Sequence, residues 1–163
     1  MKLLRVKASH FKNCCDGFTI ALTSKSKKTA EDKEYELQEI APDLHVFNTA
    51  AFIGKNASGK TTAIELLDCA YSILGEFRLE DKHYSYDGVQ LELTFYHDGF
   101  LYLYETALSS GKTMGNQAVF RDERLWRKEY FKTNVKEIFD REKLARQLTE
   151  ITRDPYDALH LPL

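Results

Sequence analysis

The residues best suited to chemistry lie at positions 54–61, where the chain reads Gly-Lys-Asn-Ala-Ser-Gly-Lys-Thr. This octapeptide is a complete G-x-x-x-x-G-K-[ST] phosphate-binding loop. Its glycines permit backbone turns in which successive N–H groups point at phosphate oxygens. Lys60 is placed to reach the β- and γ-phosphates, and the Thr61 hydroxyl to ligate Mg²⁺. The spacing therefore predicts binding of a nucleoside triphosphate together with Mg²⁺.

The flanking sequence has the order that such a loop requires. The apolar run at 50–53 is typical of a strand buried on both faces of a parallel sheet. After the loop, apolar residues recur at helical spacing, and Gly75 suits a helix C-terminus. These apolar residues are Ala63, Ile64, Leu67, Ala70, Tyr71 and Leu74. Strand, glycine loop and helix together predict a phosphate-loop α/β unit whose helix dipole faces the phosphates.

Length and charge limit the remaining possibilities. The chain has 163 residues, enough for one domain with a real core, and its formal net charge of -2 argues against a general polyanion-binding surface. Residues 121–146 hold nine Lys/Arg against six Asp/Glu. A solvated helix face is the favoured interpretation of this segment, and DNA contact stays open as the alternative.

The cysteines and the hydropathy indicate the compartment. The chain has an odd number of cysteines, Cys14, Cys15 and Cys69, and their spacing is not that of metal ligands. Neither a disulfide framework nor a zinc site is therefore indicated. The sequence contains no run of about 18 apolar residues, and its N-terminus does not form a signal segment. A soluble protein of the reducing cytoplasm, without a membrane partner, is predicted.

Strand signals occur on both sides of the loop. Alternating residues at 4–8 and 18–22 predict two early strands around a turn, and 44–47 leads toward the strand before the loop. Residues 89–96, Asp98-Gly99 and 100–106 predict a β-hairpin, followed by a third strand at 117–120 and by helix or loop from Leu125 onward.

We therefore expect an α/β fold in which the phosphate-loop unit carries an antiparallel β-layer. The predicted lobe spans residues 1–150, with a polar surface loop inserted at 24–36 and the hairpin layer at 89–120. Residues 151–163 are expected to be a frayed or truncated end.

The acidic groups that hydrolysis requires are harder to assign. A Mg²⁺-binding acid normally ends an apolar strand, but the run before Asp122 and Glu123 is interrupted by Arg121, and the run before Asp140 is too short. Glu123 and Asp140 are better explained as salt-bridged surface residues. The guanine-reading Asn-Lys-x-Asp motif and the Asp-x-x-Gly switch motif are absent, which favours ATP over GTP.

The motif residues also carry a family resemblance. The chain resembles the N-terminal lobe of an ABC-type AAA ATPase in three features. These are Phe11-Lys12-Asn13 near the end of a first strand, the run Phe52-Ile53 leading into 54–62, and a following antiparallel hairpin. The similar proteins are SMC-like repair ATPases and phage-defence ATPases of the overcoming-lysogenization-defect type. Glu123-Arg124-Leu125 and Phe139-Asp140-Arg141 are also similar to short stretches of that group, and the resemblance extends to about residue 142.

The resemblance implies a set of nucleotide-binding residues. Asn56 and Ser58 would shape the loop, Thr62 would lie near the α-phosphate, and Lys12 and Asn13 would lie near the nucleotide unless they are ordinary strand-end residues. The full candidate set is Gly54, Lys55, Asn56, Ala57, Ser58, Gly59, Lys60, Thr61, Thr62, Lys12 and Asn13, with Thr61 as the metal ligand. No catalytic residue is assigned.

The departures from the family imply half of an ATPase. Residues 108–111, Leu-Ser-Ser-Gly, resemble a signature loop, but a hairpin connection is the better interpretation. Gln117 is only a weak candidate for sensing the γ-phosphate, and the magnesium-binding Asp and catalytic Glu of a C-terminal lobe are not found. Hydrolysis would then need a second lobe or subunit, for example in a homodimer, and the resemblance implies DNA repair or phage defence.

Two alternatives remain open. The chain could be a self-contained phosphotransferase that uses Asp122 or Asp140 for Mg²⁺. It could also be a non-catalytic interaction module that retains the loop as a scaffold for a partner.

Overall fold

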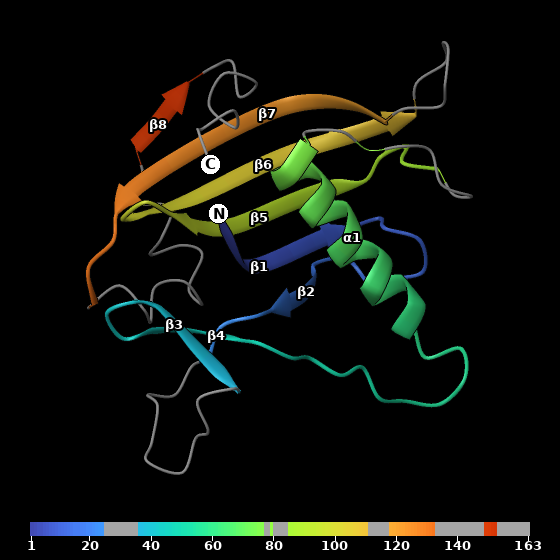
Figure 1. Cartoon of the computed structure of the whole chain (residues 1–163). Coiled ribbons are helices and arrows are strands. Elements are labelled where there is room, and N and C mark those ends of the chain that lie inside the picture. Colours follow the sequence, from blue (N-terminus) through green and yellow to red (C-terminus); the bar gives the residue numbers. More distant parts are fainter. Residues whose placement is uncertain (25–35, 77–78, 80–84, 111–117, 133–148, 153–163) are drawn as a thin grey trace.

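In the part of the chain that the structure describes, an antiparallel β-sheet is crossed by the helix α1 (Figure 1). The computed structural model describes residues 1–24, 36–76, 79, 85–110, 118–132 and the backbone of 149–152. In chain order the elements are β1 (Lys2–Ser9), β2 (Phe18–Ala21), β3 (Leu37–Ala41), β4 (Leu44–Phe47), α1 (Lys60–Glu76), β5 (Gln90–His97), β6 (Phe100–Ser110), β7 (Ala118–Glu129) and β8 (Thr149–Thr152). Six strands form one sheet in the order β2-β1-β5-β6-β7-β8, and β3 and β4 form a separate pair.

The predicted hairpin is present and its turn explains its register. Asp98 and Gly99 both have positive φ, 44° and 82°, as a two-residue turn of the type favoured between antiparallel strands requires. The turn places His97 opposite Phe100 and fixes the pairing of β5 with β6 along its length. The two predicted early strands are also observed, as the antiparallel pair β1 and β2.

Helix α1 packs its apolar side on one face of the sheet and closes the main core (Figure 1). Its buried residues are Ala63, Leu66, Cys69, Ala70, Ile73 and Leu74. They pack in one cluster with sheet residues such as Val6, Leu93 and Tyr104. Ile64 and Tyr71, which were expected on the buried side, are more than half exposed. The helix carries apolar residues on more than one side, so more than one apolar stripe fits its sequence. The contact with the sheet decides which of these stripes is buried.

A second, smaller core lies on the other face of the sheet, where the β3–β4 pair packs. Along β6, Leu101 lies opposite Tyr96 of β5, so by strand alternation both point away from the face that carries Phe95 and α1. Leu101 is buried with Leu4, Ala41, Leu44, Val46 and Tyr130. The Tyr130 hydroxyl donates a hydrogen bond of 2.6 Å to the Pro42 carbonyl in the turn between β3 and β4.

The expected α/β fold with a parallel sheet around the phosphate loop is wrong. Every strand pairing among the described residues is antiparallel, and α1 is the one helix described. Residues 50–53, expected as a buried strand, form no strand, and Ile53 is 94% exposed. Of these four residues only Phe52 packs against the main core. A four-residue apolar run cannot by itself distinguish a buried strand from a loop anchored by one side chain.

The C-terminal half also differs from the expectation. Strand β7 continues to Glu129, so the helix or loop expected from Leu125 is wrong as far as the sheet extends, and Leu125 itself is fully buried. Strand β8 pairs with β7 and crosses the expected boundary at residue 150. Residues 25–35 of the polar loop, Gln117, Asp140 and 153–163 lie outside the described residues. In the part of the chain that is described, no helix has the length and apolar character needed to cross a membrane.

Candidate functional site

The phosphate loop forms one wall of a cavity of about 990 Å³ at the N-terminus of α1. This volume is in the range that holds small-molecule ligands. The connection between β1 and β2 and the segment before the loop form the other walls. The lining residues are Asn13, Cys14, Cys15, Phe18, Ala51, Phe52, Ile53, Asn56, Ala57, Ser58, Gly59, Lys60, Thr61, Thr62 and Ala63.

Two glycines are required by the loop conformation. Gly59 has φ of 86°, in the left-handed region that side chains disfavour. Gly54 is required for space, because a Cβ there would lie 2.5 Å from the Ser58 Oγ. Ala57 also has a positive φ, 62°, which is unfavourable for a residue with a Cβ. The loop thus stores local backbone strain, a property that clusters at ligand-binding sites.

The Lys60 ammonium turns back into the loop. Its Nζ donates to the carbonyl oxygens of Gly54 at 2.8 Å and Lys55 at 2.6 Å, and lies 3.4 Å from the Ser58 Oγ. An ammonium has three N–H donors, so these contacts match its full capacity. Lys60 therefore ties the two ends of the loop together and keeps a positive charge at the cavity wall.

The start of α1 adds further positive character. Lys60 is the first helical residue, and the Ala63 N–H donates to the Gly59 carbonyl at 2.9 Å. The N–H groups of a first helical turn have no acceptor within the helix and carry the positive end of its dipole. The first turn of α1 contains no acidic residue to offset that charge. Lys60 and the helix terminus together make this wall suited to an anion.

Most of the predicted nucleotide-binding residues line the cavity. These are Asn13, Asn56, Ala57, Ser58, Gly59, Lys60, Thr61 and Thr62. Gly54 and Lys55 act instead through their carbonyls, which hold Lys60. Lys12 is not among the lining residues. Its ammonium lies 2.5 Å from the Glu65 carboxylate in the second turn of α1, so the structure gives Lys12 an ion pair between the β1–β2 connection and the helix.

Other lining residues were missed by sequence reasoning. Cys14 and Cys15 follow Asn13 directly, so the resemblance that indicated Asn13 could have extended to them. Burial raises the pKa of the Cys14 thiol, the neighbouring Cys15 raises it further, and Lys12 acts in the opposite direction. Phe18 was predicted only as a strand residue. No sequence signal indicated that the segment before the loop would be an exposed cavity wall.

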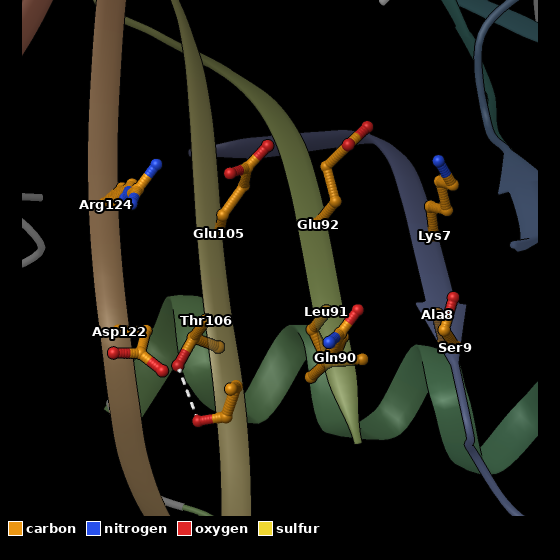
Figure 2. A pocket seen from close by; sticks show the side chains of 11 residues that line it. Lys7, Ala8, Ser9, Gln90, Leu91, Glu92, Glu105, Thr106, Asp122 and Arg124 are labelled. Atoms are coloured by element: carbon orange, nitrogen blue, oxygen red, sulfur yellow. Dashed lines mark hydrogen bonds between the residues drawn. The ribbon is translucent and has the colours of Figure 1, made fainter. Parts of the chain in front are cut away.

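Asp122 and Glu123, the acidic residues considered for Mg²⁺ that the structure describes, do not line this cavity. Asp122 lines a second hollow of about 460 Å³ that shares no lining residue with the phosphate-loop cavity. Figure 2 shows Asp122 beside Thr106, with α1 behind the sheet. Glu123 accepts a hydrogen bond of 2.6 Å from the Tyr104 hydroxyl. Burial, and then this contact with Glu123, raises the pKa of Tyr104 far above its ordinary range.

A row of four charged side chains crosses the second hollow (Figure 2). Lys7 lies opposite Glu92, Glu92 opposite Glu105, and Glu105 opposite Arg124, on strands β1, β5, β6 and β7. Like charges directly opposite each other destabilise a sheet, and opposite charges stabilise it. The outer cations therefore offset the repulsion between the two central glutamates. Glu92 gains a further cation from Arg5, whose Nη1 lies 3.5 Å from its Oε1.

The chain matches no protein-family model, and no curated protein or solved structure matches it. The resemblance to ABC-type AAA ATPases accordingly rests on the motif residues alone. Residues 108–110 of the segment that resembles a signature loop belong to β6, which pairs antiparallel with β7 and has Ser110 opposite Ala118. Gly111 lies outside the described residues. No group of three or more His, Cys, Asp or Glu side chains suited to a metal occurs within the described ranges.

Proposed function

We propose that this chain binds a nucleoside triphosphate, ATP by preference, with its phosphates on the loop at 54–62. One observation carries the proposal. The complete phosphate-loop motif spans a loop-to-helix junction beside a ligand-sized cavity. In this loop Gly59 adopts a left-handed backbone conformation, and Gly54 lies where a Cβ would crowd Ser58. The choice of ATP rests on the missing guanine motif and on the family resemblance.

Lys60 is the residue on which binding depends most. Its N–H donors now satisfy the carbonyls of Gly54 and Lys55, which are neutral acceptors. An ammonium bonded to an anionic phosphate oxygen gains the attraction between opposite charges, which it lacks when it is bonded to a neutral carbonyl. A triphosphate therefore competes well for Lys60, and the freed carbonyls turn to solvent because the loop is exposed.

Mg²⁺ fits the same site. Thr61 lines the cavity and its hydroxyl is a hard oxygen ligand of the kind that Mg²⁺ accepts alongside phosphate oxygens and water. The ion would supply charge neutralisation for the triphosphate. Thr61 would hold the metal, Lys60 would hold the terminal phosphates, and the helix N-terminus would orient them.

Hydrolysis, in this proposal, uses groups from a second lobe or subunit. Among the described residues that line the cavity there is no Asp or Glu to serve as a base or as a further metal ligand. Asp122, the described candidate for a self-contained phosphotransferase, lines the other hollow. We therefore favour nucleotide binding with little turnover by this chain alone.

Isothermal titration calorimetry with Mg-ATP tests the proposal. The Lys60→Ala variant should bind at least about tenfold more weakly than wild type, the loss of one charge-assisted contact of about 1.5–3 kcal/mol. Lys55→Ala removes the same charge from the same loop but from a side chain outside the cavity lining, so it should bind within about threefold of wild type. No binding by the folded wild-type protein, or equal loss in both variants, would refute the proposal.

A further inference from the structure

Two adjacent cysteines share the cavity with the phosphate loop. Cys14 and Cys15 both line it, together with Gly59, Lys60 and Thr61. Their connection is held by two turns, in which the Cys14 N–H donates to the Phe11 carbonyl at 3.0 Å and the Phe18 N–H to the Cys15 carbonyl at 3.1 Å. These hydrogen bonds hold the backbone of Cys14 and Cys15 at the site proposed for the nucleotide.

The two thiols differ in exposure. Cys15 is exposed, whereas Cys14 is partly buried and has its pKa raised by that burial. The thiolate is the nucleophile in thiol chemistry, so an accessible thiol reacts before one whose ionisation is suppressed. The third cysteine, Cys69, is 1% exposed and lies in the main core with its Sγ 3.9 Å from the Tyr86 hydroxyl. Cys15 is thus the cysteine open to a reagent.

We propose that Cys15 is a thiol-modification site, at which a mixed disulfide with a low-molecular-weight thiol excludes nucleotide from the phosphate-loop cavity. In the reaction the Cys15 thiolate, its proton given to solvent, attacks one sulfur of an oxidised thiol. A disulfide forms to Cys15, the reagent's S–S bond breaks, and its second sulfur leaves as a thiolate. A reduced thiol reverses the exchange.

The cavity explains why such an adduct would compete with a triphosphate. A glutathione adduct carries two carboxylates and one ammonium, so it is a net anion. The same cavity is lined by Lys60 and by the first turn of α1, which contains no acidic residue. The adduct would occupy the same space and satisfy the same positive charges as phosphate. The inference therefore rests on the proposed function and adds regulation to it.

The experiment treats wild type, Cys15→Ser and Cys69→Ser with oxidised glutathione and maps the adduct by peptide mass spectrometry. Mg-ATP affinity is then compared for each protein before and after treatment. Wild type and Cys69→Ser should gain one glutathione at Cys15, lose at least about tenfold in affinity, and recover with dithiothreitol. Cys15→Ser should have the same Mg-ATP affinity before and after treatment. Mg-ATP should also slow alkylation of Cys15 in the wild-type protein.

The outcomes separate the two proposals. Mg-ATP binding that survives full modification of Cys15, or an adduct that forms at Cys14 or Cys69 instead, overturns the inference and leaves nucleotide binding intact. Failure of untreated wild type to bind Mg-ATP contradicts the proposed function itself, and the inference falls with it.

Discussion

At the scale of single residues, the glycines of the phosphate loop and helix serve different physical ends. Gly54 provides space beside Ser58, and Gly59 provides a left-handed backbone conformation. Gly75 does neither, since it lies within α1 and a Cβ there would meet nothing within 4 Å. The motif identified the first two from sequence, because glycine at those positions is part of the loop's chemistry. The role of Gly75 as a helix C-terminus was close to correct, since α1 ends one residue later.

Substitutions at these glycines should have opposite effects on stability. Gly75→Ala should raise the free energy of unfolding by roughly 0.5–1 kcal/mol, because alanine is the better helix former and the space is free. Gly59→Ala should lower it by roughly 1–2 kcal/mol, because alanine disfavours positive φ. Urea denaturation followed by circular dichroism measures both, and a Gly59→Ala protein as stable as wild type would contradict the described loop.

Gly54→Ala should weaken Mg-ATP binding through a steric clash with Ser58, and a double variant can test this cause. The added Cβ would lie 2.5 Å from the Ser58 Oγ, so either the Ser58 side chain or the loop must shift to accommodate it. Removing that oxygen in the Gly54→Ala/Ser58→Ala double variant should restore part of the affinity lost in Gly54→Ala alone. Calorimetric titration of the three variants, including Ser58→Ala by itself, measures the coupling. Strictly additive losses would show that the Gly54–Ser58 contact is not the cause.

At the scale of elements, the sequence indicated local structure better than it indicated neighbours. The turn at Asp98-Gly99 defined the β5–β6 hairpin because its conformation is set by two residues. The strand expected at 50–53 failed because four apolar residues do not specify what they pack against. The row Lys7-Glu92-Glu105-Arg124 could not be foreseen either, since it joins four strands whose order in the sheet is a long-range property.

The Arg5–Glu92 pair tests the energetics of that sheet face. Both side chains are close to nine-tenths buried, at 12% and 10% exposure. Arg5→Met removes the cation but keeps an apolar stem. Glu92 then lies beside Glu105 with one fewer cation to offset the repulsion between the two carboxylates. Removing one partner of a buried pair costs about 3 kcal/mol. Urea denaturation should show that loss, while Lys2→Met, at an exposed position on the same strand, should change stability by less than about 0.5 kcal/mol. Equal stability of both variants would contradict the burial of this pair.

At the scale of the whole molecule, the β3–β4 pair is joined to the main sheet by a few defined contacts. The Tyr130 hydroxyl bonds to the Pro42 carbonyl, and the Phe47 N–H donates to the Leu22 carbonyl at 2.9 Å. These contacts matter for the site, because the chain leaves β4 and runs directly to the cavity wall and the phosphate loop (Figure 1). No local sequence pattern predicts the contact between Tyr130 and Pro42, because these residues are 88 positions apart in the chain.

Tyr130 should also make stability depend on alkaline pH. Burial, then the charge of Asp43, raises its pKa from 10.0 to about 12. A raised folded-state pKa favours the protonated form in the native protein, so this contribution is complete below pH 10 and is lost as the pH rises to about 12. Tyr130→Phe should therefore unfold with a shallower pH dependence over this interval. It should also lose about 1 kcal/mol at neutral pH with the hydrogen bond.

The matched control for this pH effect is Tyr71→Phe, on the exposed side of α1. It should follow wild type in denaturation curves recorded from pH 8 to pH 12. If Tyr130→Phe also follows wild type over that range, then the tyrosine does not join the β3–β4 pair to the sheet as described.

The central claim is that nucleotide phosphates bind on the loop at 54–62, and amide chemical shifts test it most directly. Titration of ¹⁵N-labelled protein with Mg-ATP should shift the amides of residues 54–63 and 13–15 most, because these line or support the cavity. The amides around the second hollow, on β5 to β7, should change little. Saturable shifts centred on the phosphate loop are the predicted result. An absence of shifts there, or shifts confined to the second hollow, would contradict the account.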